Sequence, residues 1–201
     1  MALFYQHTIN ESTKLAVWHI AETESFFTEQ VPVQREITHP HKRLQHLAGR
    51  YILKHLFPEF PHHLIEIADT RKPFLANEEY HFSISHCGNY AAAIVSKDKR
   101  VGIDIELSSP KVEKIKFKFL NEVEMTTLPV SNLQQLTRLW SAKEAVFKWS
   151  GSADVDFREH ILLDKVKWDS IEGRFIKNHP IQITVNFSSL DELTLAYIIS
   201  P

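Results

Sequence analysis

The chain has very little cysteine, and this scarcity excludes two kinds of structural support. Its 201 residues include a single cysteine, Cys87, which cannot form a disulfide within the chain. The twelve histidines are scattered, and no cysteine and histidine pairs occur at zinc-ligand spacing. A thiol nucleophile at Cys87, next to His86, is an alternative that no other residue supports. We therefore expect neither a disulfide framework nor a structural zinc site.

Long apolar runs and an excess of charge of one sign are also missing. No apolar run approaches the roughly 20 residues that a membrane-spanning helix needs, and residues 1–10 lack the basic segment and apolar core of a signal peptide. The net charge is −2, which argues against bulk nucleic-acid binding. We expect a cytoplasmic monomer that binds neither membranes nor nucleic acid.

The chain does have enough apolar residues for a sizeable core. Its predicted elements also follow a similar pattern in the two halves of the sequence. With 43% hydrophobic residues it can form one large domain or two small lobes. Residues 44–57 read as an amphipathic helix that ends before Pro58, and Ala48–Lys54 parallels Ala142–Lys148 position by position. Strand pairs around short turns are predicted at 81–85 with 90–96 and at 181–187 with 193–200. The pattern suggests a duplicated unit of helix and hairpin, with a boundary near 97–100.

Four charged residues have spacings that bring them onto shared faces. Glu144 and Lys148 lie one turn apart in a predicted helix, and Asp104 and Glu106 lie on the same side of a predicted strand. Three carboxylates and a lysine can hold a hard divalent cation together with the phosphate that it carries. The alternatives are a plain surface ion pair for the helix and a plain edge strand for the two acids.

The helix itself argues against the plain alternative. Its apolar stripe consists of Leu139, Ala142, Val146 and Trp149. Glu144 and Lys148 therefore lie opposite the core, yet Trp140 is on their side. An exposed tryptophan beside a charge pair indicates a second covered face.

These residues carry a resemblance to a known family. The run Val101–Glu106, followed by Trp140–Lys148, resembles the signature of the 4'-phosphopantetheinyl transferases of the surfactin-synthetase type. Arg71-Lys72-Pro73 is similar to the basic-proline element of that family, and Phe82–His86 to its Ser-His strand end. The resemblance implies an α+β fold of two similar lobes, 1–98 and 99–201, related by a pseudo-twofold axis with the active site in the cleft between them.

The activity that the resemblance implies is transfer of the phosphopantetheine arm of coenzyme A to a serine of an apo acyl or peptidyl carrier protein, as in holo-[acyl-carrier-protein] synthases. Asp104, Glu106 and Glu144 are then ligands of a magnesium ion, and Lys148 steadies the pyrophosphate. Two residues are candidates for the base: Glu144, acting directly or through a metal-bound water, and Glu124, which matches another acidic position of the family. An exposed helix start is the alternative for Glu124 and its neighbour Glu122.

The resemblance also implies a separate clamp for the 3'-phosphate of coenzyme A. His86 is the matching candidate, helped by Arg71 or Lys72. The sequence departs from the family at His41, where an arginine or lysine is usual, so Lys42, Arg43 or Arg50 is expected to substitute. A second departure is Gly151-Ser152-Ala153, where Gly-x-Gly is usual.

The segment Lys111–Phe119 places lysines among apolar residues and is predicted to dock an acidic carrier protein, with an exposed basic face as the alternative. Two other functions stay open. One is a magnesium-dependent hydrolase of pyrophosphate bonds that uses water in place of a serine. The other is a non-catalytic module that binds coenzyme A.

Overall fold

The protein, described by a computed structural model over residues 3–33, 36–68 and 72–200, has the predicted α+β fold. The chain divides into two compact units, Met1–Val101 and Gly102–Pro201. The lobe boundary at 98/99 and the pseudo-twofold relation stay predictions. Within the described ranges, no helix combines the length and the apolar character needed to cross a membrane.

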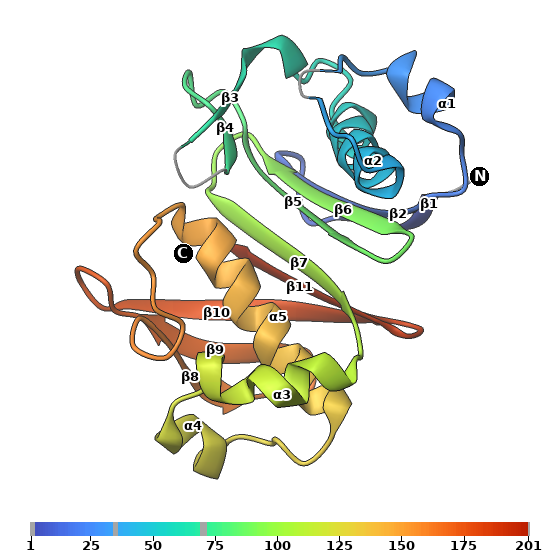
Figure 1. Ribbon diagram of the computed structural model, residues 1–201. Coiled ribbons are helices and arrows are strands. Elements are labelled where there is room, and N and C mark those ends of the chain that lie inside the picture. Colours follow the sequence, from blue (N-terminus) through green and yellow to red (C-terminus); the bar gives the residue numbers. More distant parts are fainter. Residues whose placement is uncertain (1–2, 34–35, 69–71, 201) are drawn as a thin grey trace. The chain divides into compact units, whose positions relative to one another are not determined.

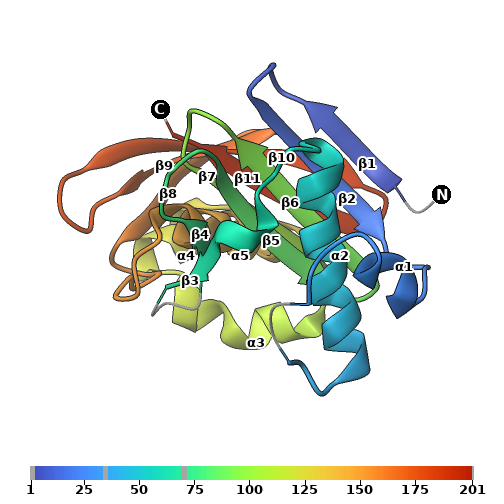
Figure 2. The same cartoon turned by 90° about the horizontal axis from the view of Figure 1, so that it is seen from above.

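The first unit is an antiparallel sheet with one long helix packed on it. The sheet has the order β1-β2-β6-β5, and α2 lies along one of its faces, as Figures 1 and 2 show. The strands and helices of this unit are β1 (Leu3–Thr8), β2 (Thr13–His19), α1 (Glu24–Thr28), α2 (Pro40–Leu56), η1 (His62–Leu64), β3 (Ile65–Ile67), β4 (Pro73–Leu75), β5 (His81–Cys87) and β6 (Tyr90–Ser96).

The predicted hairpin of the first unit is confirmed. Strands β5 and β6 pair from His81 opposite Ser96 to Cys87 opposite Tyr90. The turn includes Gly88, whose φ of 52° lies in the left-handed region that glycine adopts most easily. Helix α2 begins earlier than predicted, because Pro40 stands in its first turn and the His39 ring accepts a hydrogen bond from the backbone N–H of Lys42.

The second unit contains a five-stranded sheet, in the order β7-β11-β10-β9-β8. Helix α5 crosses this sheet (Figure 1), and α3 packs against α5. The elements are β7 (Val101–Leu107), α3 (Pro110–Phe119), α4 (Glu122–Thr127), α5 (Leu133–Ser150), β8 (Ile161–Val166), β9 (Ser170–Phe175), β10 (Ile181–Leu190) and β11 (Leu193–Ile199). The predicted C-terminal hairpin is confirmed as β10 and β11.

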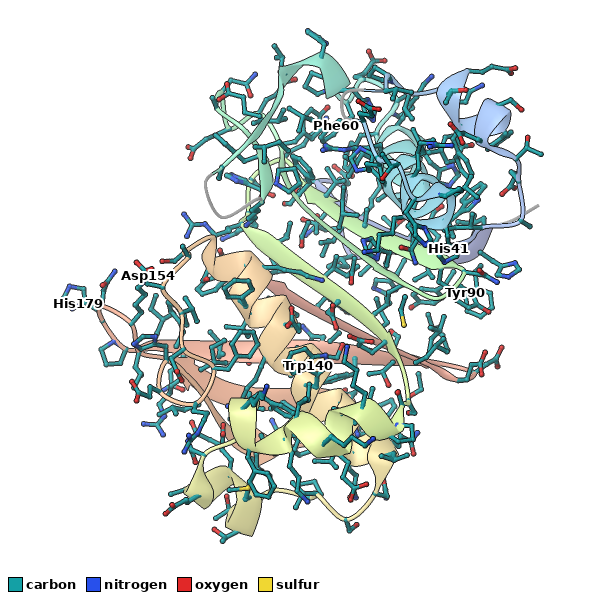
Figure 3. The ribbon with its side chains drawn as sticks, in the orientation of Figure 1. His41, Phe60, Tyr90, Trp140, Asp154 and His179 are labelled. Atoms are coloured by element: carbon teal, nitrogen blue, oxygen red, sulfur yellow. The ribbon has the colours of Figure 1, made fainter. Side chains whose placement is uncertain are left out.

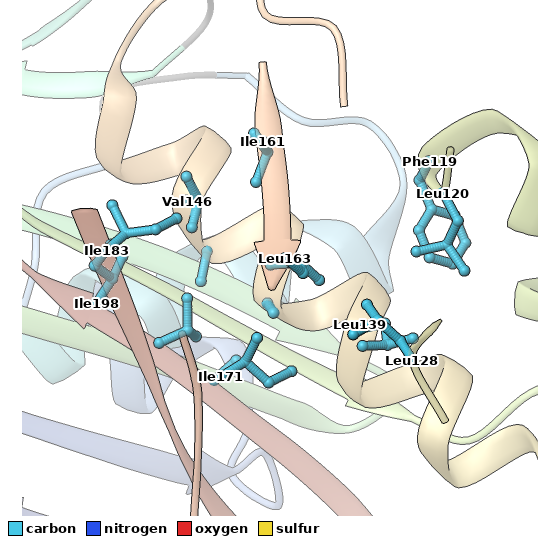
Figure 4. Packing of buried hydrophobic residues seen from close by; sticks show 14 of the residues in the cluster. Phe119, Leu120, Leu128, Leu139, Val146, Ile161, Leu163, Ile171, Ile183 and Ile198 are labelled. Carbon is cyan, nitrogen blue, oxygen red and sulfur yellow. The ribbon is translucent and has the colours of Figure 1, made fainter. Parts of the chain in front are cut away.

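The core of the second unit lies between α5 and the sheet. Leu139 and Val146 on the helix belong to the same buried cluster as Ile161, Ile171 and Ile198 on the strands (Figure 4). All four residues of the predicted apolar stripe are at most 5% exposed. The stripe is therefore confirmed, and burial of this face orients the polar side of α5 away from the core.

Strand β7 approaches α5 closely because residue 102 is glycine. A Cβ atom at Gly102 would lie 2.1 Å from the backbone oxygen of Ala145 and 2.8 Å from the backbone nitrogen of Trp149. These are helix backbone atoms, which cannot turn aside as a side chain can. Gly102 thus allows β7 to run directly against α5, and this places Asp104 within reach of α5 side chains.

We expect Gly102→Ala to destabilise the protein by about 1–3 kcal/mol or more, because β7 and α5 must separate to fit the methyl group. Urea unfolding measures the effect. Gly49→Ala is the matched control, since its Cβ would meet only the Ile84 side chain, at 2.6 Å from Cγ2, and a side chain can rotate. Equal losses of stability in the two variants would contradict this account of Gly102.

Candidate active site

Asp104 is a buried carboxylate that two side chains of α5 hold. Its neighbours on β7, Ile103 and Ile105, are buried, and Asp104 itself is 3% exposed. Oδ1 accepts a hydrogen bond from Lys148 Nζ at 2.7 Å, and Oδ2 accepts one from Ser141 Oγ at 2.9 Å. The charge of Lys148 compensates the carboxylate, which makes burial of Asp104 tolerable.

Glu106, two residues further along β7, also contacts α5. Its Oε1 accepts a hydrogen bond from Trp140 Nε1 at 3.0 Å. The Trp140 ring, labelled in Figure 3, stacks on the Phe157 ring with 5.7 Å between the ring centroids. It makes an edge contact with the Phe119 ring, with 5.1 Å between the centroids. The tryptophan therefore does have the second covered side that its position opposite the stripe indicates.

Glu144 is the third carboxylate of the group. Its pKa is raised to about 7, chiefly by burial and then by the charge of Asp104; Glu106 adds to the shift, and Lys148 opposes it. Asp104, Glu106, Glu144 and Lys148 are thus within electrostatic reach of one another. Strand β7 does lie at the edge of its sheet, but Asp104 is buried on it and pairs with Lys148. Neither a plain surface ion pair nor an edge strand with solvated acids describes this arrangement.

The carboxylate group suits a divalent cation in its chemistry, although its side chains are not arranged around one. Among the residues with described positions, no cluster of three or more histidine, cysteine, aspartate or glutamate side chains stands ready to hold a metal ion. Burial raises the pKa of Glu144 most, and repulsion by Asp104 and Glu106 raises it further; a bound cation would relieve that repulsion. Carboxylate oxygens are also the ligands that magnesium prefers. The donor set therefore fits the metal that the sequence predicts.

A hollow adjoins this group within the second unit. Its volume is about 120 Å³, and Glu106 and Trp140 form part of its wall. The remaining wall residues are Leu107, Ser109, Lys111, Val112, Ile115 and Thr137. The hollow offers a mixed apolar and polar surface beside the carboxylates.

Glu124, predicted as a second candidate base, has an extensive set of structural contacts. Oε2 accepts hydrogen bonds from Lys143 Nζ at 2.7 Å and from the Asn121 backbone N–H, and Oε1 accepts one from the Leu163 backbone N–H. Glu124 is 2% exposed, so the alternative of an exposed helix start is wrong for it. These contacts account for Glu124 as a helix cap and ion-pair partner, and its catalytic role stays a prediction.

Lys143 is a residue that the sequence reasoning missed. Its side chain is fully buried, and Nζ also donates to the Phe157 carbonyl at 2.8 Å. Burial lowers its pKa to about 8, while Glu124 acts in the opposite direction. A signal was present, because Lys143 lies four residues after Leu139 and so falls on the core side of the helix.

The residues predicted to clamp the 3'-phosphate lie in the first unit. His86 is an exposed residue of β5. Lys72 precedes β4, and its pKa is lowered to about 8, first by burial and then by the charge of Arg100. Arg71 falls outside the described residues. The coenzyme A contacts of all three stay predictions.

The substitutes predicted for His41 have different surroundings on α2. Arg43 donates from Nε and Nη2 to Glu24 and from Nη1 to the Ile37 carbonyl. Arg50 is 5% exposed, its Nη1 has no hydrogen-bond partner, and burial lowers its pKa to about 10. His41 itself contacts the carbonyl of Gly88 through Nε2, and Figure 3 places it near Tyr90 at that turn. Arg50 thus has a buried donor that no described residue satisfies.

Comparison with known proteins bears on the second unit above all. A family model described as the 4'-phosphopantetheinyl transferase superfamily matches residues 100–198. Through these residues, the chain belongs to the 4'-phosphopantetheinyl transferase superfamily. The match contains the whole of the carboxylate group, so the resemblance seen in the motifs is confirmed at the level of the superfamily.

Two relatives support the same membership. A protein named 4'-phosphopantetheinyl transferase AcpT from Escherichia coli K12 is 31% identical over 119 residues, which are 56% of this chain and 60% of that protein. Enterobactin synthase component D of Salmonella typhi is 34% identical over 147 residues, which are 69% of this chain and 59% of that protein. The chain thus spans about three fifths of the length of these curated relatives.

Proposed function

We propose that this member of the phosphopantetheinyl transferase superfamily moves the 4'-phosphopantetheine arm of coenzyme A to a serine of an apo acyl or peptidyl carrier protein. The serine oxygen attacks the β-phosphorus, the bond from that phosphorus to the bridging oxygen breaks, and adenosine 3',5'-bisphosphate leaves with the bond electrons. The observation that carries the proposal is the meeting of Asp104, Glu106, Glu144 and Lys148 on β7 and α5.

The chain's own residues supply binding and proton transfer in this reaction. Lys148 ion-pairs with Asp104 and keeps a side chain that is 24% exposed, so a bound pyrophosphate could contact its ammonium group. Glu144, with a pKa near neutrality, is suited to take the serine proton. Asp104, Glu106 and Glu144 would hold magnesium, which neutralises charge that develops on the phosphates.

The hollow beside Glu106 suits the pantetheine arm. Leu107, Val112 and Ile115 offer apolar contacts for its methylene groups, while Ser109 and Thr137 can bond its amides. An arm in this position would have its phosphate end near the carboxylate of Glu106. This placement agrees with attack at the phosphorus that carries the arm.

In this reaction, basic residues of the 1–98 lobe would bind the 3'-phosphate of coenzyme A. Burial lowers the pKa of both Lys72 and Arg50. The Nη1 group of Arg50 is buried without a hydrogen-bond partner, so the charge of Arg50 lacks full compensation. A bound phosphate would supply that compensation. A single coenzyme A molecule that contacts both lobes is what the resemblance implies.

Similar connectivity within each unit supports the proposed pseudo-twofold pair of lobes. In the first unit, β2 precedes α2 and pairs with β6, the last strand of the hairpin. In the second unit, β7 precedes α5 and neighbours β11, again the last strand of the hairpin. Both units thus share the order strand, long helix and hairpin, and in both the strand neighbours the last strand of the hairpin.

We expect His86→Ala to reduce discrimination between coenzyme A and dephospho-coenzyme A. A hydrogen bond to a charged group contributes about 1.5–3 kcal/mol, so the preference should fall roughly tenfold or more. The ratio of kcat/KM for the two substrates, measured in both proteins, checks this. His81→Ala, at the other end of β5, should leave the ratio unchanged. An unchanged ratio in His86→Ala would mean that His86 does not contact the 3'-phosphate and is a structural residue at the end of the strand.

Helix α3 is the proposed docking surface for the carrier. The helix carries four lysines, namely Lys111, Lys114, Lys116 and Lys118. Phe117 is 61% exposed among them, whereas Ile115 packs against the core. An exposed aromatic ring within positive charge suits a carrier with an acidic surface. Lysines steer the partner, and the ring adds contact area.

The deciding experiment is mass spectrometry of apo carrier proteins incubated with this protein, magnesium and coenzyme A. A mass gain of one phosphopantetheine group supports the proposal. Cleavage of coenzyme A without any carrier would instead indicate a hydrolase. Binding of coenzyme A without turnover over a panel of acyl and peptidyl carriers would indicate a binding module.

A further inference from the structure

Two consecutive residues of α5 each donate to a different carboxylate of β7. Trp140 Nε1 donates to Glu106 Oε1 at 3.0 Å, and Ser141 Oγ donates to Asp104 Oδ2 at 2.9 Å. Lys148 takes the other oxygen of Asp104, at 2.7 Å. Both carboxylates are therefore held from the same helix.

The direction of the Ser141 hydroxyl is unusual for this helix. Hydroxyl groups within helices commonly bond a carbonyl of the preceding turn. Thr137 does so with Leu133, and Ser150 with Phe147. Ser141, which is fully buried, donates to the strand instead. Its hydrogen bond serves the carboxylate rather than the helix.

The Trp140 ring is fixed on two sides. Phe157 stacks on it with an interplanar angle of 17°, and Phe119 meets it at 63°. A ring held in this way has little freedom to turn, so its N–H keeps one direction. The rotamer of Glu106 is consequently selected by the aromatic cluster.

We propose that Trp140 and Ser141 are positioning residues that orient the Glu106 and Asp104 carboxylates for the divalent cation. The inference rests on the proposed function, because it assumes that these carboxylates are metal ligands. A ligand that is already oriented loses less freedom on binding, and outer partners of this kind typically contribute 10–100-fold to metal affinity. Two neighbouring residues of α5 thus set the orientation of both carboxylates of β7.

The test is the Mg²⁺ dissociation constant of the full chain, measured by calorimetry without coenzyme A. Ser141→Ala and Trp140→Phe should each weaken Mg²⁺ binding by about 10–100-fold. The matched controls are Ser150→Ala and Trp149→Phe on the same helix, which lose hydrogen bonds to Phe147 and Ser200. The controls should bind Mg²⁺ as the parent does.

A second variant separates the hydrogen bond from packing. Ser141→Cys fills nearly the same space with a weak donor, so it should also bind Mg²⁺ weakly. Normal affinity in Ser141→Cys beside weak affinity in Ser141→Ala would overturn the inference in favour of packing. Thermal unfolding of each variant confirms that the protein measured is folded.

The proposed function is tested separately by the carrier assay on the parent. If the parent transfers phosphopantetheine and Ser141→Ala and Trp140→Phe bind Mg²⁺ as the parent does, the positioning role is wrong and the function stands. If the parent binds Mg²⁺ and the two variants bind weakly but no carrier is modified, the positioning role stands and the function is wrong. A parent without Mg²⁺ affinity overturns the positioning role, and the carrier assay alone then decides the function.

Discussion

Glu144→Gln should lower the rate of phosphopantetheine transfer by about 10²-fold or more while the protein stays folded. The change removes an anionic ligand and the group proposed to take the serine proton, yet it preserves size. Glu144 lies opposite the apolar stripe of α5, so its charge is not needed for the core. Removal of this half-buried carboxylate, whose pKa is raised, also relieves repulsion by Asp104 and Glu106.

The measurement is single-turnover transfer to an apo carrier at saturating Mg²⁺, with urea unfolding in parallel. Glu159→Gln, at an exposed position of the same unit, is the charge-matched control and should keep the parental rate. Near-normal turnover in Glu144→Gln would remove Glu144 from the reaction. A slow variant that is also unstable would point to a structural role.

Lys143→Met should destabilise the protein by about 3–5 kcal/mol, because it leaves the Glu124 carboxylate buried without its cation. Both side chains are at most 3% exposed. The lysine also donates to the Phe157 carbonyl, which would lose that partner. Equilibrium unfolding in urea measures the loss, and the double variant Lys143→Met with Glu124→Gln should recover part of it.

An exposed ion pair gives the matched control. Arg174 and Asp164 bond through two nitrogens but are each 42% exposed, so Arg174→Met should cost less than about 1 kcal/mol. A cost for Lys143→Met no larger than that of the control would mean that Glu124 finds other compensation. Glu124→Gln, assayed under folded conditions, also tests the predicted catalytic role, which requires a slow rate without loss of structure.

Much of the fold follows from local patterns in the sequence. The hairpin turn at Gly88 and the stripe from Leu139 to Trp149 rest on short-range chemistry, and both are confirmed. Strands β8 and β9 were not predicted. In β8 the register shifts between Leu163 and Lys165, so the strand departs from strict alternation. Such a departure depends on the partner strand, which the local sequence does not reveal.

The candidate site divides in the same way. Periodicity alone brought Asp104, Glu106, Glu144 and Lys148 to shared faces, because it fixes which side chains share a side of an element. It could not give the donors that hold these carboxylates, since Trp140 and Ser141 reach them across two packed elements. The buried contacts of Glu124 likewise depend on tertiary packing, which a local pattern does not contain.

Two neighbouring residues of α5 face in different directions, since Lys143 is buried in the core and Glu144 lies with the carboxylate group. Each residue added to a helix rotates everything after it by about 100°. One inserted or deleted residue between Leu139 and Lys143 would therefore turn the acid inward and the lysine away from its partner. Length changes in this stretch should thus be far less tolerated than single substitutions on its surface.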